Sequence, residues 1–94
     1  MNEKQFLEFQ ARMNAMKEVI KIYDPEKFEE LSSVDCFWAP ETRPLRYSVW
    51  VQENYEINPN SIVSLKVYSL LMDMPIDQVR EKMIAYTEKS AKIK

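Results

Sequence analysis

The chain has 94 residues, of which 46% are hydrophobic and 30% charged, and its thirteen basic and fifteen acidic side chains give a net charge of −2. This length accommodates one domain, residues 1–94, and the near-neutral charge argues against a protein whose main task is to coat nucleic acid. The sequence has no histidine and no glycine, which excludes histidine-based catalytic centres and metal sites and also glycine-rich phosphate loops. We therefore expect no enzyme, no metal and no cofactor.

Residues 3–23 form the clearest predicted helix. Six apolar side chains recur there at alternating spacings of three and four residues: Phe6, Phe9, Met13, Met16, Ile20 and Tyr23. This is the a/d pattern of a coiled-coil seam. The seam either packs on its own domain, pairs with a second copy in a homodimer, or holds a helix of another protein, because methionine adapts to varied surfaces.

A short helix is predicted for residues 25–33. Asp24 is placed to cap it, and Pro25 suits the first helical position, where a missing N–H costs nothing. Phe28 and Leu31 then face inward, so the first two helices form a hairpin.

Residues 32–42 have no clear periodicity but contain several apolar side chains: Val34, Cys36, Phe37, Trp38 and Pro40. We expect a loop that either plugs the core or contacts a partner, since aromatic residues and arginine dominate many protein interfaces. Cys36 is the only cysteine and has no histidine to activate it, so we predict a small buried apolar side chain.

Residues 42–55 fit two secondary structures. Alternation of Tyr47, Val49 and Val51 suits one short strand at 46–52. A capping threonine, a proline in the first turn and four apolar residues at helical spacing suit a helix equally well: Thr42, Pro44, Tyr47, Trp50, Val51 and Tyr55. We favour the helix, because a lone strand would have no partner.

Two arginines accompany the aromatic residues of this region. Arg43 and Arg46 either cover the faces of Trp38 and Trp50 at the surface or form a site for stacked bases and phosphate. The first arrangement is the more common in proteins.

Residues 58–86 predict two helices joined by a tight break. Ser61 can cap the first helix, which is apolar on almost every side, and Asp73 can adopt a left-handed turn before Pro75. In the second helix, four residues at helical spacing face inward: Ile76, Val79, Met83 and Tyr86.

The spacing across this break resembles the DNA-binding helix-turn-helix family. Four residues fit its pattern, a small one in the first helix and apolar ones around the turn and in the second helix: Ser69, Met72, Met74 and Val79. Two depart from it, since Asp73 stands at the usual turn glycine and Lys82 at an apolar position. The resemblance implies a small DNA-binding regulator with Arg80, Lys82 and Lys89 as phosphate or groove contacts, whereas Asp77 and Glu81 on the same helix would repel phosphates.

These elements predict an all-α domain, a small bundle of four to five short helices with a helix-turn-helix-like corner near the C-terminus and the first helix laid across that corner. No apolar run reaches the roughly 18 residues that a membrane-spanning helix requires, and the first residues lack the layout of a signal peptide. With a single cysteine, this predicts a cytoplasmic protein without a membrane partner.

The leading functional interpretation is a non-enzymatic protein-binding module, such as a small intracellular inhibitor, adaptor or assembly factor, that buries an apolar and aromatic surface on a partner protein. The predicted contact residues are Phe37, Trp38, Arg43, Arg46 and Trp50. Two alternatives stay open: the DNA-binding regulator, with the 6–23 seam as dimer interface, and a structural homo-oligomer. Compact and without catalytic residues, the chain resembles the small accessory proteins of bacteriophages and mobile elements.

Overall fold

The computed structural model describes residues 2–93, with side chains through residue 89, and this part of the chain is all-α. Its five helices are α1 (Glu3–Tyr23), α2 (Pro25–Asp35), α3 (Arg43–Asn54), α4 (Ile62–Met72) and α5 (Ile76–Ile93). Residues 42–55 therefore contain a helix, and no strand occurs within the described residues. None of the described helices combines the length and the apolar character that crossing a membrane would need.

Most helix starts are set by the residues that the sequence indicates. The Asp24 carboxylate accepts the backbone N–H of Lys27, and the Ser61 hydroxyl accepts that of Ser64, as capping residues do. Thr42 differs, because its hydroxyl donates to the Ala39 carbonyl and leaves the start of α3 without a side-chain cap. The second helix also extends two residues beyond the predicted 25–33, to Asp35.

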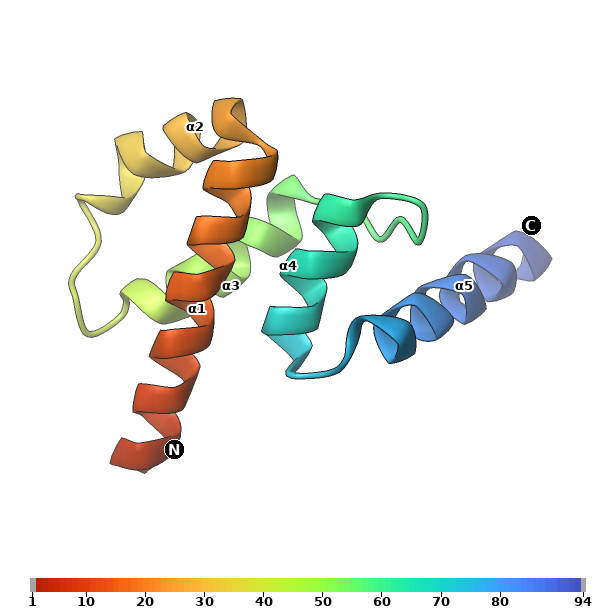
Figure 1. Ribbon diagram of the computed structural model, residues 1–94, viewed down its shortest axis with the longest axis horizontal. Coiled ribbons are helices and arrows are strands. Elements are labelled where there is room, and N and C mark those ends of the chain that lie inside the picture. The colour runs from red at the N-terminus through yellow and green to blue at the C-terminus, as the bar shows by residue number, and fades with distance from the viewer. Residues whose placement is uncertain (1, 94) are drawn as a thin grey trace.

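Helix α1 lies at the centre of the bundle. It packs against α2, α3 and α4 (Figure 1), and its buried seam residues form the core with residues of every other helix. The buried apolar side chains are Met13, Met16, Ile20, Leu31, Tyr47, Val51, Tyr55, Leu65, Val67, Tyr68, Val79 and Met83.

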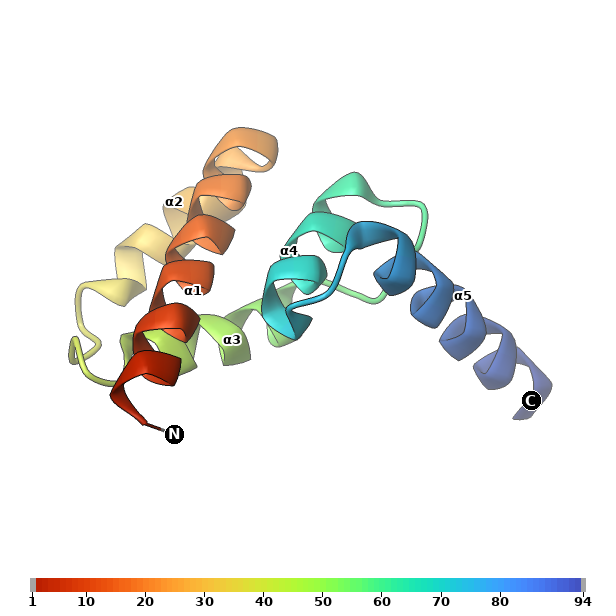
Figure 2. The same cartoon turned by 60° about the horizontal axis from the view of Figure 1, so that its bottom comes forward.

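Helix α5 is attached mainly to α4, and its C-terminal half points away from the rest of the molecule (Figures 1 and 2). The expectation that α1 crosses the corner of the last two helices is wrong, because α1 packs on α4 instead. Helix α5 contacts the bundle through its first half: Val79 and Met83 are buried, whereas Tyr86, one turn later on the same apolar face, is 56% exposed.

A polar cluster joins the first three helices. The Asp35 carboxylate, only 7% exposed as a residue, accepts hydrogen bonds from the Lys17 ammonium at 2.5 Å and the Tyr47 hydroxyl at 2.8 Å. Burial opposes ionisation of Asp35, but these two hydrogen bonds and the charge of Lys17 outweigh it and hold the pKa of the carboxyl below its ordinary value. Each residue comes from a different helix, so the cluster ties α1, α2 and α3 together.

Candidate functional site

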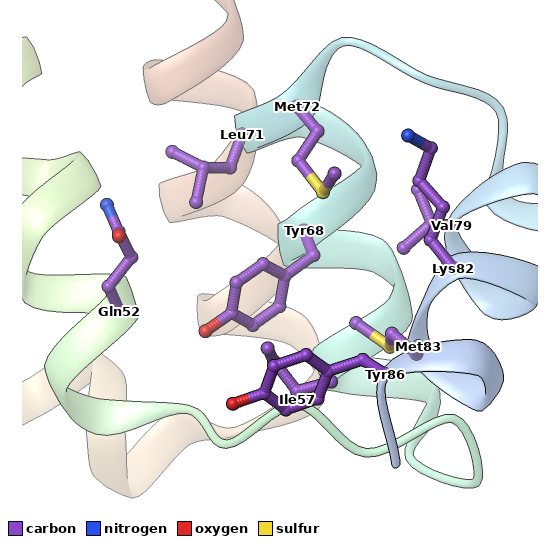
Figure 3. A pocket seen from close by; sticks show the side chains of 9 residues that line it. All are labelled: Gln52, Ile57, Tyr68, Leu71, Met72, Val79, Lys82, Met83 and Tyr86. Atoms are coloured by element: carbon purple, nitrogen blue, oxygen red, sulfur yellow. The ribbon is translucent and has the colours of Figure 1, made fainter. Parts of the chain in front are cut away.

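An apolar groove opens between α4, α5 and the segment that joins α3 to α4 (Figure 3). It encloses about 310 Å³ and is lined by Gln52, Ile57, Tyr68, Leu71, Met72, Val79, Lys82, Met83 and Tyr86. A second hollow shares four of these residues and continues the groove to Tyr55 and Glu56. Lys82 is the one charged residue that lines the main groove within the described chain.

The groove has a buried floor and an exposed apolar rim. Val79 and Met83 are fully or almost fully buried. At the rim, Met72 is 43% exposed, Tyr86 56% and Ile57 37%. Scattered exposed apolar residues are ordinary on protein surfaces, but three large ones around a single apolar hollow are characteristic of a binding site.

The angle between α4 and α5 follows from the turn that joins them. Asp73 ends α4 in the left-handed conformation, with φ 55° and ψ 51°. The Met74 N–H donates to the Ser69 carbonyl at 3.1 Å, and the Ser69 hydroxyl donates to the Met74 carbonyl at 2.5 Å. Because the turn is bonded back to α4 in this way, the two helices diverge at a fixed angle and leave the groove between them.

The third wall, residues 55–61, is held by side chains of α4. The Tyr68 hydroxyl donates to the Tyr55 carbonyl at 2.7 Å, and the Ser64 hydroxyl donates to the Glu56 carbonyl at 3.0 Å. Burial raises the pKa of the Tyr68 phenol, so it stays a neutral donor at physiological pH. Ile57 follows directly after these two anchored residues, so its place at the rim is fixed before any ligand arrives.

The predicted contact residues form a separate surface, the aromatic patch, made of Phe37, Trp38, Arg43, Arg46 and Trp50. Trp38 packs edge-to-face on Tyr47 at 5.7 Å, the Arg46 guanidinium lies 6.0 Å from the centre of the Trp38 ring, and Arg43 donates to the Trp38 carbonyl at 2.9 Å. Phe37 is 82% exposed. Four of the five residues therefore meet around the 36–42 loop.

Trp50 lies one helical turn beyond Arg46 on α3. It packs edge-to-face on Tyr55 at 6.2 Å and is half-buried. Within the loop, Trp38 packs against the core, as the core-plugging alternative predicts, while Phe37 is exposed to solvent. The prediction that Cys36 is buried is wrong: it ends α2 and is exposed, since α2 continues to Asp35 and carries the next residue outside the core.

The 6–23 seam faces its own domain. Met13, Met16 and Ile20 are buried in the core, Phe6 and Phe9 are half-buried, and Tyr23 is 45% exposed with the Lys66 ammonium 5.3 Å from its ring. While the chain keeps this fold, only the two ends of the seam are accessible to a second molecule.

Of the residues implied by the helix-turn-helix resemblance, Arg80, Lys82 and Lys89 are all exposed on α5. Helical geometry places Lys82 and Lys89 on one side and Arg80 on the other. The outer face between them, opposite the buried Val79, carries three exposed carboxylates: Asp77, Glu81 and Glu88.

Within the described residues, no three side chains of histidine, cysteine, aspartate or glutamate lie close enough to hold a metal ion. Sequence reasoning missed the groove, although it placed Val79, Met83 and Tyr86 on one face of α5. The signal that could have revealed the groove is the length of this apolar face, which extends beyond the part of α5 that α4 covers. No protein-family model, no curated protein and no solved structure matches the chain.

Proposed function

We propose that the protein is a protein-binding module, a small intracellular inhibitor, adaptor or assembly factor that acts in the cytoplasm, and that the α4–α5 groove is its main partner site. The observation that carries the proposal is the set of exposed apolar side chains, Ile57, Met72 and Tyr86, around one apolar floor. Covering such a surface contributes about 25 cal/mol for each Å² removed from water. This gain is available only when a partner is bound.

The walls of the groove are also preorganised. Hydrogen bonds from Ser64, Tyr68 and Ser69 fix the loop and the turn that bound it, so binding does not have to order these segments. Preorganisation lowers the entropic cost of association. The volume of about 310 Å³ lies at the lower end of the range for small-molecule sites, and it suits a few apolar anchor side chains of a protein.

The aromatic patch is the second surface that we assign to partner contact. Its free anchor is Phe37, because Trp38 and Trp50 are already half-covered by the protein itself. We place the patch second because its Trp38 ring is partly covered by Arg46. The anchor side chains that dominate protein interfaces tend to fill desolvated pockets, as the groove allows.

The alternatives receive less support. A DNA contact through α5 would bring Asp77, Glu81 and Glu88 toward phosphates, which repel them. A homo-oligomer built on the 6–23 seam would have to use Phe6 and Tyr23 at its ends, since the middle of the seam is inside the core.

The proposal is tested by site-specific photo-crosslinking in cells. A photo-reactive amino acid at position 72 is expected to give one stoichiometric adduct with a partner, and Tyr86→Glu should abolish that adduct because it puts a charge at the apolar rim. Ile22→Glu is the matched control, since Ile22 is 69% exposed but lies outside the groove. The free energy of unfolding of both variants should lie within about 0.5 kcal/mol of the wild-type value, as is usual for surface substitutions.

Two results would overturn the proposal: an adduct that persists with Tyr86→Glu, or an adduct that is lost equally with Ile22→Glu. Either result would mean that the crosslink reports non-specific association and not binding in the groove. Phe37→Ala in the same assay measures the contribution of the aromatic patch. If the adduct is unchanged there, the groove alone holds the partner.

A further inference from the structure

We infer that the occupant of the groove is an amphipathic helix of a partner protein, with apolar anchors on one face and carboxylates along the flank that faces α5. The inference rests on the proposed function and names the chemistry of the partner.

A helix fits the shape of the walls. Two sides of the groove are the helices α4 and α5, whose backbone groups are bonded within each helix, so an added strand would find no row of free N–H and C=O groups. Helices bind in such grooves through anchors at positions i, i+3 or i+4, and i+7. The projecting half of α5 (Figure 1) extends one wall beyond the floor, which gives a helix of several turns a surface to lie along.

The positive charges on α5 favour a partner helix that carries carboxylates on the side facing α5. Lys82 lines the groove, and Lys89 follows seven residues later, almost exactly two helical turns, on the same side of α5. The two lysines are therefore separated by about 10 Å along the helix axis. Neither takes part in an ion pair within the described part of the chain. Two carboxylates seven residues apart on a partner helix match this spacing.

The wall opposite α5 carries a negative charge. Glu56 lines the continuation of the groove on the side of the 55–61 segment, and it is exposed. A partner helix with carboxylates toward α5 and a basic residue toward Glu56 satisfies both walls. Apolar anchors supply most of the affinity at such sites, and the charges decide which helix is accepted and in which direction it lies.

The test selects binders without assuming their identity. A display library of random 16-residue peptides is selected in parallel on the wild type, on the double variant Lys82→Glu/Lys89→Glu and on Arg80→Glu. Arg80 is the matched control, since it is a cation of the same helix that faces away from the groove. Only peptides whose binding is lost with Tyr86→Glu are analysed, so that every sequence counted is a groove binder.

We expect wild-type binders to carry apolar residues at helical spacing with Asp or Glu beside them, and binders of the double variant to carry Lys or Arg there. A wild-type binder should lose about tenfold in affinity on the double variant at low salt and keep its affinity on Arg80→Glu. Groove binders with no acidic bias, or with the same bias on all three proteins, overturn the inference and leave the protein-binding function intact. If no binder depends on Tyr86, both fail together.

Discussion

Two junctions in this small bundle are built on opposite principles. Where α1, α2 and α3 meet, a nearly buried carboxylate receives a lysine and a tyrosine, and the polar groups satisfy one another. Where α4 meets α5, packing by Val79 and Met83 holds the helices, and apolar surface beyond them stays uncovered. The first junction is closed and contributes stability. The second is fixed in shape but open, and its apolar rim stays in contact with water.

The difference has a consequence for mutations. A buried ionised group that loses its partner is left with its desolvation cost, so changes at the first junction affect folding. Side chains at the groove rim are already in contact with water, so changes there should have little effect on folding.

Asp35→Ala is expected to have the largest effect. It removes the acceptor of both the Lys17 and the Tyr47 hydrogen bonds. The Lys17 ammonium, on a side chain that is only 27% exposed, then has no counter-ion. We expect the free energy of unfolding to fall by about 3 kcal/mol, measured by urea denaturation followed by tryptophan fluorescence.

Glu29→Ala is the control for this variant, because Glu29 lies on the same helix but is exposed. It should change the free energy of unfolding by less than about 0.5 kcal/mol. Equal effects for Asp35→Ala and Glu29→Ala would mean that the polar cluster contributes nothing specific to the fold.

The sequence predicts the helix boundaries at the two junctions better than it predicts the contacts that make each junction. Capping residues and the Asp73–Pro75 break are local signals, and they correctly placed the starts of α2 and α4 and the end of α4. The polar cluster joins residues that lie 12 and 18 positions apart, and no local pattern marks such a pair. The groove is equally non-local, since its lining extends from Gln52 to Tyr86. Residues 42–55 were ambiguous because both helix and strand patterns were present, and packing on α1 decided between them.

Acid is expected to weaken the first junction more than the second. The pKa of Asp35 is lower in the folded protein than its ordinary value, so its contribution is complete above the unfolded pKa of about 3.9 and is lost as the pH falls through the folded value. Asp35→Asn lacks this titration. Below about pH 4 the urea midpoint of the wild type should therefore fall more steeply than that of the variant.

The acid effect should be smaller than that of Asp35→Ala, because a protonated carboxyl still accepts the hydrogen bond from Tyr47. No carboxylate is among the described residues that line the groove between α4 and α5, so amide exchange at Val79 and Met83 provides an internal reference for the corner. Superimposable acid profiles for the wild type and Asp35→Asn would show that the Lys17–Asp35 pair makes no net contribution.

The smallest effect concerns the turn that gives the groove its shape. Asp73 holds a left-handed conformation with φ 55°, which glycine adopts without the steric cost of a Cβ atom. Its carboxylate also stands at the C-terminal end of α4, where a negative charge is unfavourable. Asp73→Gly should therefore raise the free energy of unfolding by about 0.5 kcal/mol, after the greater freedom of glycine in the unfolded chain is included.

Asp73→Ala separates conformation from charge. It also removes the carboxylate, but it places in the left-handed region a side chain that cannot form a local hydrogen bond. We therefore expect the free energy of unfolding, measured by urea denaturation, to fall by about 1 kcal/mol. Affinity for a groove-binding peptide should stay within about twofold for Asp73→Gly, because glycine keeps the same backbone path. A destabilised glycine variant would instead mean that the Asp73 side chain makes a favourable contact, and the corner would then depend on a polar group just as the first junction does.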